Sequence, residues 1–113
     1  MTILLDTGTV TPSSRPDYWS AGIARHFFPM RLEPLDDRAF AARLSGGELG
    51  PVAVRSIRGV PHRVTRAARM IARTDPDCLL LYVVRHGECQ IEQDGRSCLL
   101  RPGDMALQDT WRP

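Results

Sequence analysis

The amino-acid sequence predicts a mainly-β fold, a sandwich or barrel of short strands preceded by one α-helix. From residue 30 onward, short apolar runs alternate with closely spaced turn signals, whereas a helix needs a longer uninterrupted window. One helix-length amphipathic window lies near the start of the chain, and one tight hairpin signal lies in its second half. The turn signals are Pro34–Asp37, Gly46-Gly47, Gly50-Pro51, Gly59–Pro61, Asp75-Pro76, Gly87, Asp94-Gly95 and Pro102-Gly103.

Most of the first 14 residues are small or polar, and they end in Thr-Pro-Ser-Ser, which predicts an irregular lead-in. The next window predicts a helix, because Trp19, Ile23 and Phe27 recur four residues apart and therefore share one face. Pro29 ends this helix, since proline cannot donate the next backbone hydrogen bond. Residues 65–73 space their arginines at helical intervals, so a second, short helix is allowed between the strands.

The run Leu79–Val84 is apolar on both faces and predicts a central strand that is covered on both sides. The hairpin that follows turns at Asp94-Gly95, which suits the two positive-φ positions of a type I′ turn. This turn puts Cys89 and Cys98 in diagonal positions, too far apart for a disulfide, so we expect them to be small buried residues. The register pairs Gln93 with Arg96, Ile91 with Cys98, and Cys89 with Leu100.

The composition is that of one ordinary globular domain: 113 residues, 42% hydrophobic, with a net charge of +2. All 15 basic residues are arginine, so neither a lysine Schiff base nor a Walker-type phosphate loop can form. We find no membrane span and no signal peptide. Three cysteines are an odd number without zinc-motif spacing, and we expect a cytoplasmic protein with reduced thiols.

Five motifs occur in an order that resembles the AraC-binding-like sensor domain at the N-terminus of AraC-type transcription regulators. They are Asp17-Tyr18-Trp19, His62-Arg63-Val64-Thr65-Arg66, Gln93-Asp94-Gly95-Arg96, Leu100-Arg101-Pro102-Gly103-Asp104 and Asp109-Thr110-Trp111-Arg112-Pro113. The resemblance runs from about Asp17 to the end of the chain. It implies a cupin-like β-barrel or jelly roll that admits a small effector, a homodimer, and control of transcription through a downstream helix-turn-helix domain.

We therefore expect residues 1–14 to be the lead-in and residues 15–113 to be the cupin-like effector-binding and dimerisation domain. No segment is typical of a recognition helix, so we expect this chain to contact DNA only through a domain that it does not contain. The barrel is either complete or lacks a strand at its C-terminal end, which would leave an edge that another chain can pair with. A truncated regulator and a free-standing module that pairs with a regulator both remain open.

Enzymatic chemistry finds little support in the sequence. Metal-dependent cupins resemble one another in a His-x-His pair, whereas His26, His62 and His86 are scattered. No cysteine lies at a predicted helix N-terminus that would lower its pKa. We therefore expect no cofactor, no metal and no catalytic residues, and the alternative is a small metal-dependent cupin enzyme.

Three residues are candidates for binding the effector: His62, Arg66 and Tyr82. His62 and Arg66 share a strand face. Arg66 also matches an arginine that recurs in the family, so the resemblance implies a structural or ligand-binding role for it. The Tyr82 hydroxyl either binds a ligand in the barrel or satisfies a backbone carbonyl.

An arginine-rich stretch without acidic residues runs from residue 49 to residue 74. Its arginines either read an anionic group of the effector, lie near the DNA backbone in a longer protein, or form a solvated face. They are Arg55, Arg58, Arg63, Arg66, Arg69 and Arg73.

Overall fold

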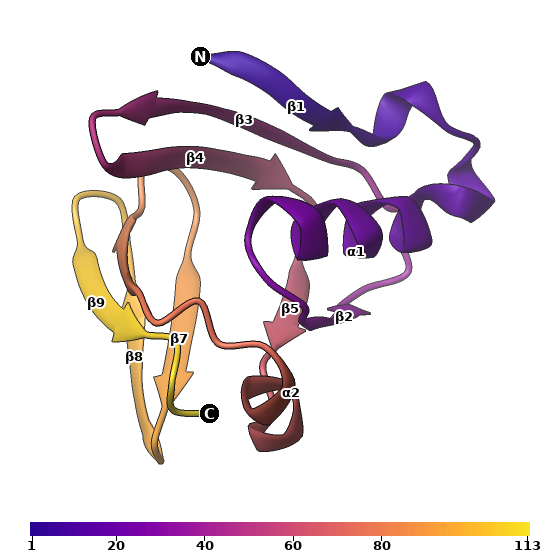
Figure 1. Cartoon of the computed structure of the whole chain (residues 1–113). Helices are drawn as coiled ribbons and strands as arrows, with labels where there is room; N and C mark the ends of the chain where they lie inside the picture. The colour runs from indigo at the N-terminus through magenta and orange to yellow at the C-terminus, as the bar shows by residue number, and fades with distance from the viewer. The chain divides into compact units, whose positions relative to one another are not determined.

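A computed structural model describes residues 1–113, and these divide into two compact units, Met1–Thr65 and Arg66–Pro113. Both units consist mainly of strands, and the N-terminal helix is present, so the predicted mainly-β class is confirmed (Figure 1). Each unit is described by itself below. The extent of the predicted single domain at residues 15–113 stays a prediction.

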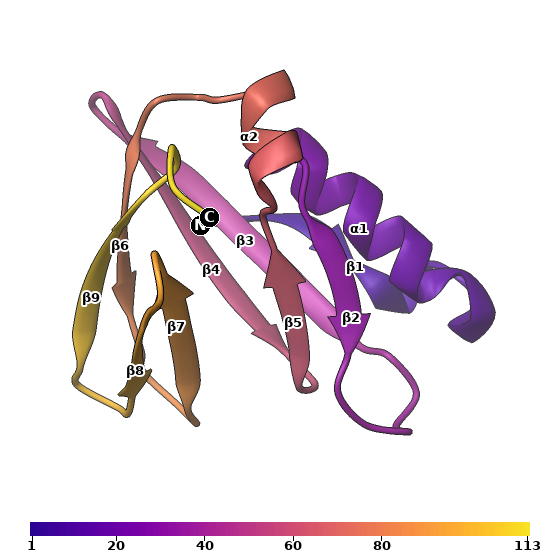
Figure 2. The same cartoon turned by 90° about the horizontal axis from the view of Figure 1, so that it is seen from below.

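The first unit contains a three-stranded antiparallel sheet in the order β1-β3-β4 and a two-stranded sheet of β2 and β5. Figure 2 shows β2 and β5 side by side, as their antiparallel register requires. The elements are β1 (Thr2–Asp6), two short 3-10 turns at Thr7–Thr9 and Pro12–Ser14, α1 (Arg15–His26), β2 (Arg31–Pro34), β3 (Ala42–Leu49), β4 (Val52–Gly59) and β5 (His62–Thr65).

Strand β1 corrects the predicted irregular lead-in. Residues 2–6 pair with β3, and Leu5 lies in the core with only 3% of its surface exposed. The strand is short and its register shifts between Ile3 and Leu5, so it lacks the repeated alternation that identifies a strand in a sequence. After it, the carboxylate of Asp6 accepts a hydrogen bond from the backbone N–H of Gly8 and starts the first 3-10 turn.

Helix α1 confirms the predicted helix. Trp19 and Ile23 face inward and are buried, and the helix ends at His26, three residues before Pro29. Figure 1 shows α1 beside the sheet of β1, β3 and β4, and residues from the helix and from this sheet share one hydrophobic core. The buried members of this core are Leu5, Trp19, Ile23, Phe40, Ala42 and Leu44.

The second unit begins with the short helix α2 (Ala68–Arg73), which agrees with the allowed helix at residues 65–73. It continues with β6 (Leu79–Val83), β7 (Cys89–Gln93), β8 (Arg96–Leu100) and β9 (Met105–Asp109). These strands form two antiparallel pairs, β6 with β9 and β7 with β8.

The β7–β8 hairpin has the predicted register, with Gln93 opposite Arg96 and Cys89 opposite Leu100. Asp94 and Gly95 both have positive φ, 56° and 74°, as a type I′ turn requires. All three cysteines are free, but Cys98 is exposed, so the expectation that it is buried is wrong. Cys98 lies on the same face of the hairpin as Cys89 and Ile91, which are half-buried, so this face is only partly covered.

Strand β6 departs further from the prediction. It pairs only with β9, and Leu79, Leu81 and Val83 are 56–63% exposed, so the strand is neither central nor covered on both sides. The other face, which carries Leu80 and Tyr82, is half-buried. The strands form four separate hydrogen-bonded sheets, so they are not closed into the expected barrel.

Candidate functional site

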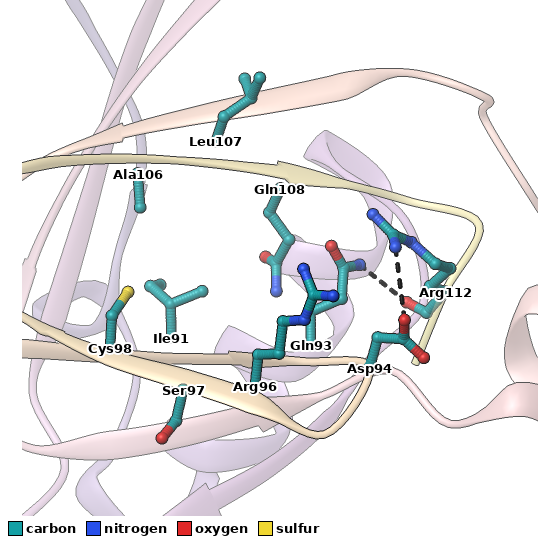
Figure 3. A pocket seen from close by; sticks show the side chains of 10 residues that line it. All are labelled: Ile91, Gln93, Asp94, Arg96, Ser97, Cys98, Ala106, Leu107, Gln108 and Arg112. Carbon is teal, nitrogen blue, oxygen red and sulfur yellow. Dashed lines mark hydrogen bonds and ion pairs between the residues drawn. The ribbon is translucent and has the colours of Figure 1, made fainter.

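A cavity of about 230 Å³ lies in the second unit, where the β7–β8 hairpin faces β9 (Figure 3). Its lining is mixed, with the side chains of Ile91, Cys98 and Ala106 toward one end and amide and charged groups toward the other. The apolar lining residues are Ile91, Cys98, Ala106 and Leu107, and the polar ones are Gln93, Asp94, Arg96, Ser97, Gln108 and Arg112.

Strand periodicity explains how these side chains converge. Alternate residues of a strand point to the same face, so Ile91 and Gln93 of β7 project together. The hairpin register places Cys98 and Arg96 of β8 directly opposite them. Ala106 and Gln108 are likewise two residues apart on β9, and the tight turn at Asp94-Gly95 brings Asp94 to the end of the cavity.

The polar end of the cavity is held by a hydrogen-bonded cluster around the buried Asp109. Its carboxylate accepts hydrogen bonds from the Arg112 guanidinium, with Nη2 to Oδ2 at 2.6 Å, and from the backbone N–H groups of Trp111 and Arg112. Gln93 Nε2 donates to the Asp109 carbonyl at 2.8 Å and to the Arg112 carbonyl at 2.9 Å. The last residues of the chain are therefore tied to the hairpin.

This cluster fixes the charge state of its members. The hydrogen bond and ion pair with Arg112 hold the pKa of Asp109 below its usual value, and Asp109 raises the pKa of Arg112. Arg112 Nη1 also lies 3.4 Å from a carboxylate oxygen of Asp94. The positive charge of Arg112 is thus matched twice within the chain.

Arg96 differs from Arg112, although both line the same cavity. It is exposed, and its side chain makes no hydrogen bond or ion pair within the chain. Its guanidinium extends from β8 into the space lined by Gln93 and Gln108 (Figure 3). The cavity therefore holds one cationic group whose charge no neighbouring carboxylate matches.

Tyr82, a predicted ligand residue, is half-buried on β6 opposite Ala106, whose side chain lines the cavity. Burial raises its pKa to about 12, with further contributions from the thiols of Cys89 and Cys78. Burial also raises the pKa of Cys89, which disfavours the reactive thiolate.

Arg66, the second predicted residue, lies in a second polar cluster of the same unit. Its Nε donates to the carbonyl of Thr110 at 3.2 Å, and its Nη2 donates to the carbonyl of Thr74. The hydroxyl of the buried Thr110 in turn donates to Asp75 at 2.9 Å and accepts a hydrogen bond from the backbone N–H of Cys78 at 3.1 Å. Arg66 therefore helps to hold the segment before β6 against the end of β9.

His62, the third predicted residue, belongs to the first unit. Its ring lies edge-on to Phe40 and Trp19, with centroids 5.4 and 6.0 Å apart, and its Nδ1 lies 2.8 Å from the carbonyl oxygen of Val60. None of His62, Arg66 and Tyr82 lines the cavity. Their role in ligand binding stays a prediction.

The cavity residues themselves were missed, although one signal was present. The hairpin register put Gln93 and Arg96 at one end of an otherwise apolar face, and a polar pair in that position marks either a strand end or a site. The contribution of β9 had no comparable signal, because strand pairing between distant segments is not encoded in local periodicity.

A second hollow, of about 570 Å³, is open to solvent in the first unit and contains four arginines. Three of them are engaged: Arg43 pairs with Asp6 at 3.1 Å, Arg38 pairs with Asp36, and Arg15 donates to backbone carbonyls. The fourth is Arg58, from the predicted arginine-rich stretch. Arg55 of that stretch pairs instead with Glu48 at 3.4 Å.

No three histidine, cysteine or acidic side chains come close enough together to hold a metal ion. Neither helix has the length and the apolar character that crossing a membrane requires.

Comparison with known proteins gives a consistent result. The sequence model of the AraC-binding-like domain matches residues 19–113. A Bacillus sp. (strain OxB-1) protein described as "Uncharacterized protein in nit 5'region" is 30% identical over the whole chain, which covers 44% of that protein. The transcriptional activator NphR of Rhodococcus sp. is 32% identical over 80 residues, which are 71% of this chain and 24% of NphR. The chain thus spans less than half of either relative, and no solved structure matches it.

Proposed function

Because this chain belongs to the AraC-binding-like domain family, whose fold is cupin-like, we propose that it senses a small effector for an AraC-type transcription regulator. It does so without catalysing a reaction. The name of NphR, a transcriptional activator, supports the regulatory role. The relatives are more than twice as long as this chain, which supports DNA contact through a helix-turn-helix domain of a longer protein. We also propose that the protein forms a homodimer and is located in the cytoplasm.

The observation that carries the proposal is the cavity between the β7–β8 hairpin and β9. Mixed lining, with an apolar floor and a few convergent polar groups, is typical of sites for small molecules. The same lining includes Gln93 and Arg112, which tie down residues 109–113. A bound molecule that contacts these two side chains changes the stability of that segment.

A ligand shifts a conformational equilibrium only by its difference in affinity for the two states. The two states proposed here differ in whether residues 109–113 are held on the hairpin. In the held state Asp94 N–H donates to the Pro113 carbonyl at 2.9 Å, and Gln93 Nε2 reaches the Arg112 carbonyl. The effector favours one of these states and so changes how the rest of the regulator is positioned.

The test is to fill the cavity and to follow both binding and transcription. Ala106→Phe places a ring in the cavity, whereas Ala53→Phe places the same ring on an exposed position of β4. We expect small molecules that raise the melting temperature of the wild-type chain to lose this effect in Ala106→Phe and to keep it in Ala53→Phe.

The same two substitutions in the chromosomal gene test the regulatory part. We expect Ala106→Phe to abolish the response of the target transcripts to the effector and Ala53→Phe to leave it intact. A response that survives in a stably folded Ala106→Phe protein would show that this cavity is not the sensor.

A further inference from the structure

We infer that the molecule taken by the cavity is a small monocarboxylate, with its carboxylate bound by Arg96. This inference rests on the proposed function and names the chemical class of the effector. It follows from the pairing of the charged side chains in the lining, the position of Arg96 and the size of the cavity.

The pairing of the charged side chains gives the sign of the group that the cavity would bind. The charged lining residues are Arg96, Arg112 and Asp94. Arg112 is 2.6 Å from the Asp109 carboxylate and 3.4 Å from that of Asp94, so both of these acids are already paired with it. Arg96 is the one charged lining side chain that has no ion-pair partner in the chain, so the ligand group that complements it is anionic.

The position of Arg96 gives the chemical group. Arg96 stands opposite Gln93 on the cavity face of the hairpin, and its planar fork of N–H groups points into the space between the hairpin and β9 (Figure 3). The amide of Gln93 is committed to backbone and carboxylate oxygens, whereas Gln108 Nε2 makes a single hydrogen bond, to the Glu92 carbonyl. Arg96 therefore supplies the main contact to a carboxylate, and Gln108 has an N–H left for a second one.

The size and the remaining lining describe the rest of the molecule. A cavity of about 230 Å³ is below the range of roughly 300–1,000 Å³ that drug-sized ligands occupy. Ile91, Ala106 and Cys98 line it away from the charged end. A short aliphatic or single-ring body fits this apolar part of the lining, and the second cation of the cavity, Arg112, is already paired with Asp109 and Asp94.

Matched probe pairs test the inference directly. Butyrate and benzoate carry the predicted charge, and butyramide and benzamide have nearly the same shape without it. We expect the acids to bind the wild-type chain, measured by calorimetric titration, and the amides to bind about ten- to hundredfold more weakly, as a lost charge-assisted hydrogen bond predicts.

Variants locate the interaction. Arg96→Gln should weaken binding of the acids by the same factor while leaving the amides unchanged, and Arg96→Lys should restore binding in part, because lysine keeps the charge but loses the planar fork. The matched control is Arg101→Gln, since Arg101 is an exposed arginine of the same unit that pairs with Glu88 and does not line the cavity. We expect it to bind the acids as the wild type does.

The outcomes separate this inference from the proposed function. If the amides bind as well as the acids and Ala106→Phe blocks both, the cavity is a ligand site but the carboxylate assignment is overturned. If the acids bind equally to Arg96→Gln, Arg96 is not their partner. If only neutral or cationic compounds bind in the cavity, the assignment of the ligand as a carboxylate is overturned, whereas the proposed sensing function is retained. If no compound of any charge binds, both are overturned.

Discussion

The two units of this chain are built from similar short strands but are held together in different ways. The first unit has an apolar core around Trp19, which is completely buried by α1 and the sheet beside it. The second unit buries one large apolar side chain, Leu100, and two polar residues, Asp109 and Thr110. Hydrophobic burial is therefore the main source of stability in the first unit, and hydrogen bonds and ion pairs matter more in the second.

This difference agrees with the position of the candidate ligand site, which lies in the second unit. A well-packed core has one arrangement, because any change in volume within it is costly. A hydrogen-bonded cluster at the edge of a cavity can be rearranged by a ligand that offers competing partners. The unit with the weaker core is thus the one that contains the candidate site.

The largest effect should come from removing the same side chain in the two units. Leu44 is completely buried in the first unit, whereas Leu81 is 63% exposed in the second. Leu44→Ala should lower the free energy of unfolding by about 2–5 kcal/mol, because it leaves a cavity in the core. Leu81→Ala should change it by less than about 0.5 kcal/mol. Urea denaturation measures both, and equal losses would show that the contrast between the units does not exist.

The polar cluster of the second unit should respond next. Thr110→Val keeps the shape of the side chain but removes its hydrogen bonds to Asp75 and to the backbone N–H of Cys78. We expect a loss of about 1–3 kcal/mol, because buried polar groups are left unsatisfied. Thr65→Val is the matched control, since Thr65 is exposed and its hydroxyl has no partner. A neutral Thr110→Val would mean that this cluster does not stabilise the unit.

Asp109 should make the stability of the second unit depend on acid. Its folded pKa is lowered from 3.8, chiefly by the hydrogen bond from Arg112, so its contribution is present above pH 3.8. That contribution is lost as the pH falls through the lowered folded value. We expect the gap in urea midpoint between the wild type and Asp109→Asn to be widest at neutral pH and to close in acid.

The control for this pH dependence is Asp37→Asn, which changes an exposed aspartate without a partner. Its midpoint should follow that of the wild type throughout the acid range. A gap for Asp109→Asn that stays constant with pH would show that the charge of Asp109 contributes nothing.

The smallest effect concerns Tyr82, which reports whether the second unit has any dry interior. Its raised pKa means that the neutral phenol stabilises the fold below pH 10.0 and that this contribution is lost as the pH rises through about 12. The difference in phenolate absorbance between the wild type and Tyr82→Phe, recorded soon after a pH jump, should therefore show a transition near pH 12. A transition near pH 10 would show that Tyr82 is open to water.

The sequence was informative where one local pattern decides the structure. The spacing of Trp19, Ile23 and Phe27 predicted α1, and Asp94-Gly95 predicted the hairpin and its register. Both signals lie within a few residues of the element that they specify. The resemblance to the AraC-binding-like domain rested on five short motifs of this kind that occur in a fixed order.

The sequence failed where the outcome depends on a distant partner. An apolar run such as Leu79–Val84 indicates the energetic gain from burial but not whether a covering element exists, and one of its faces is exposed. The cavity was not predicted for the same reason, because it forms only when β9 lies opposite a hairpin that precedes it in the chain. The predicted ligand residue Arg66 takes part in hydrogen bonds that hold the second unit together, and its role in ligand binding stays a prediction.

The exposed face of the β6–β9 pair also governs how this chain behaves in concentrated solution. Leu81 stands opposite Leu107 and Val83 opposite Met105, and all four are more than half exposed. Contiguous apolar surface of this kind promotes aggregation, particularly on a two-stranded sheet with free edges. A single charge at its centre, Leu81→Glu, should raise the solubility limit of the isolated chain.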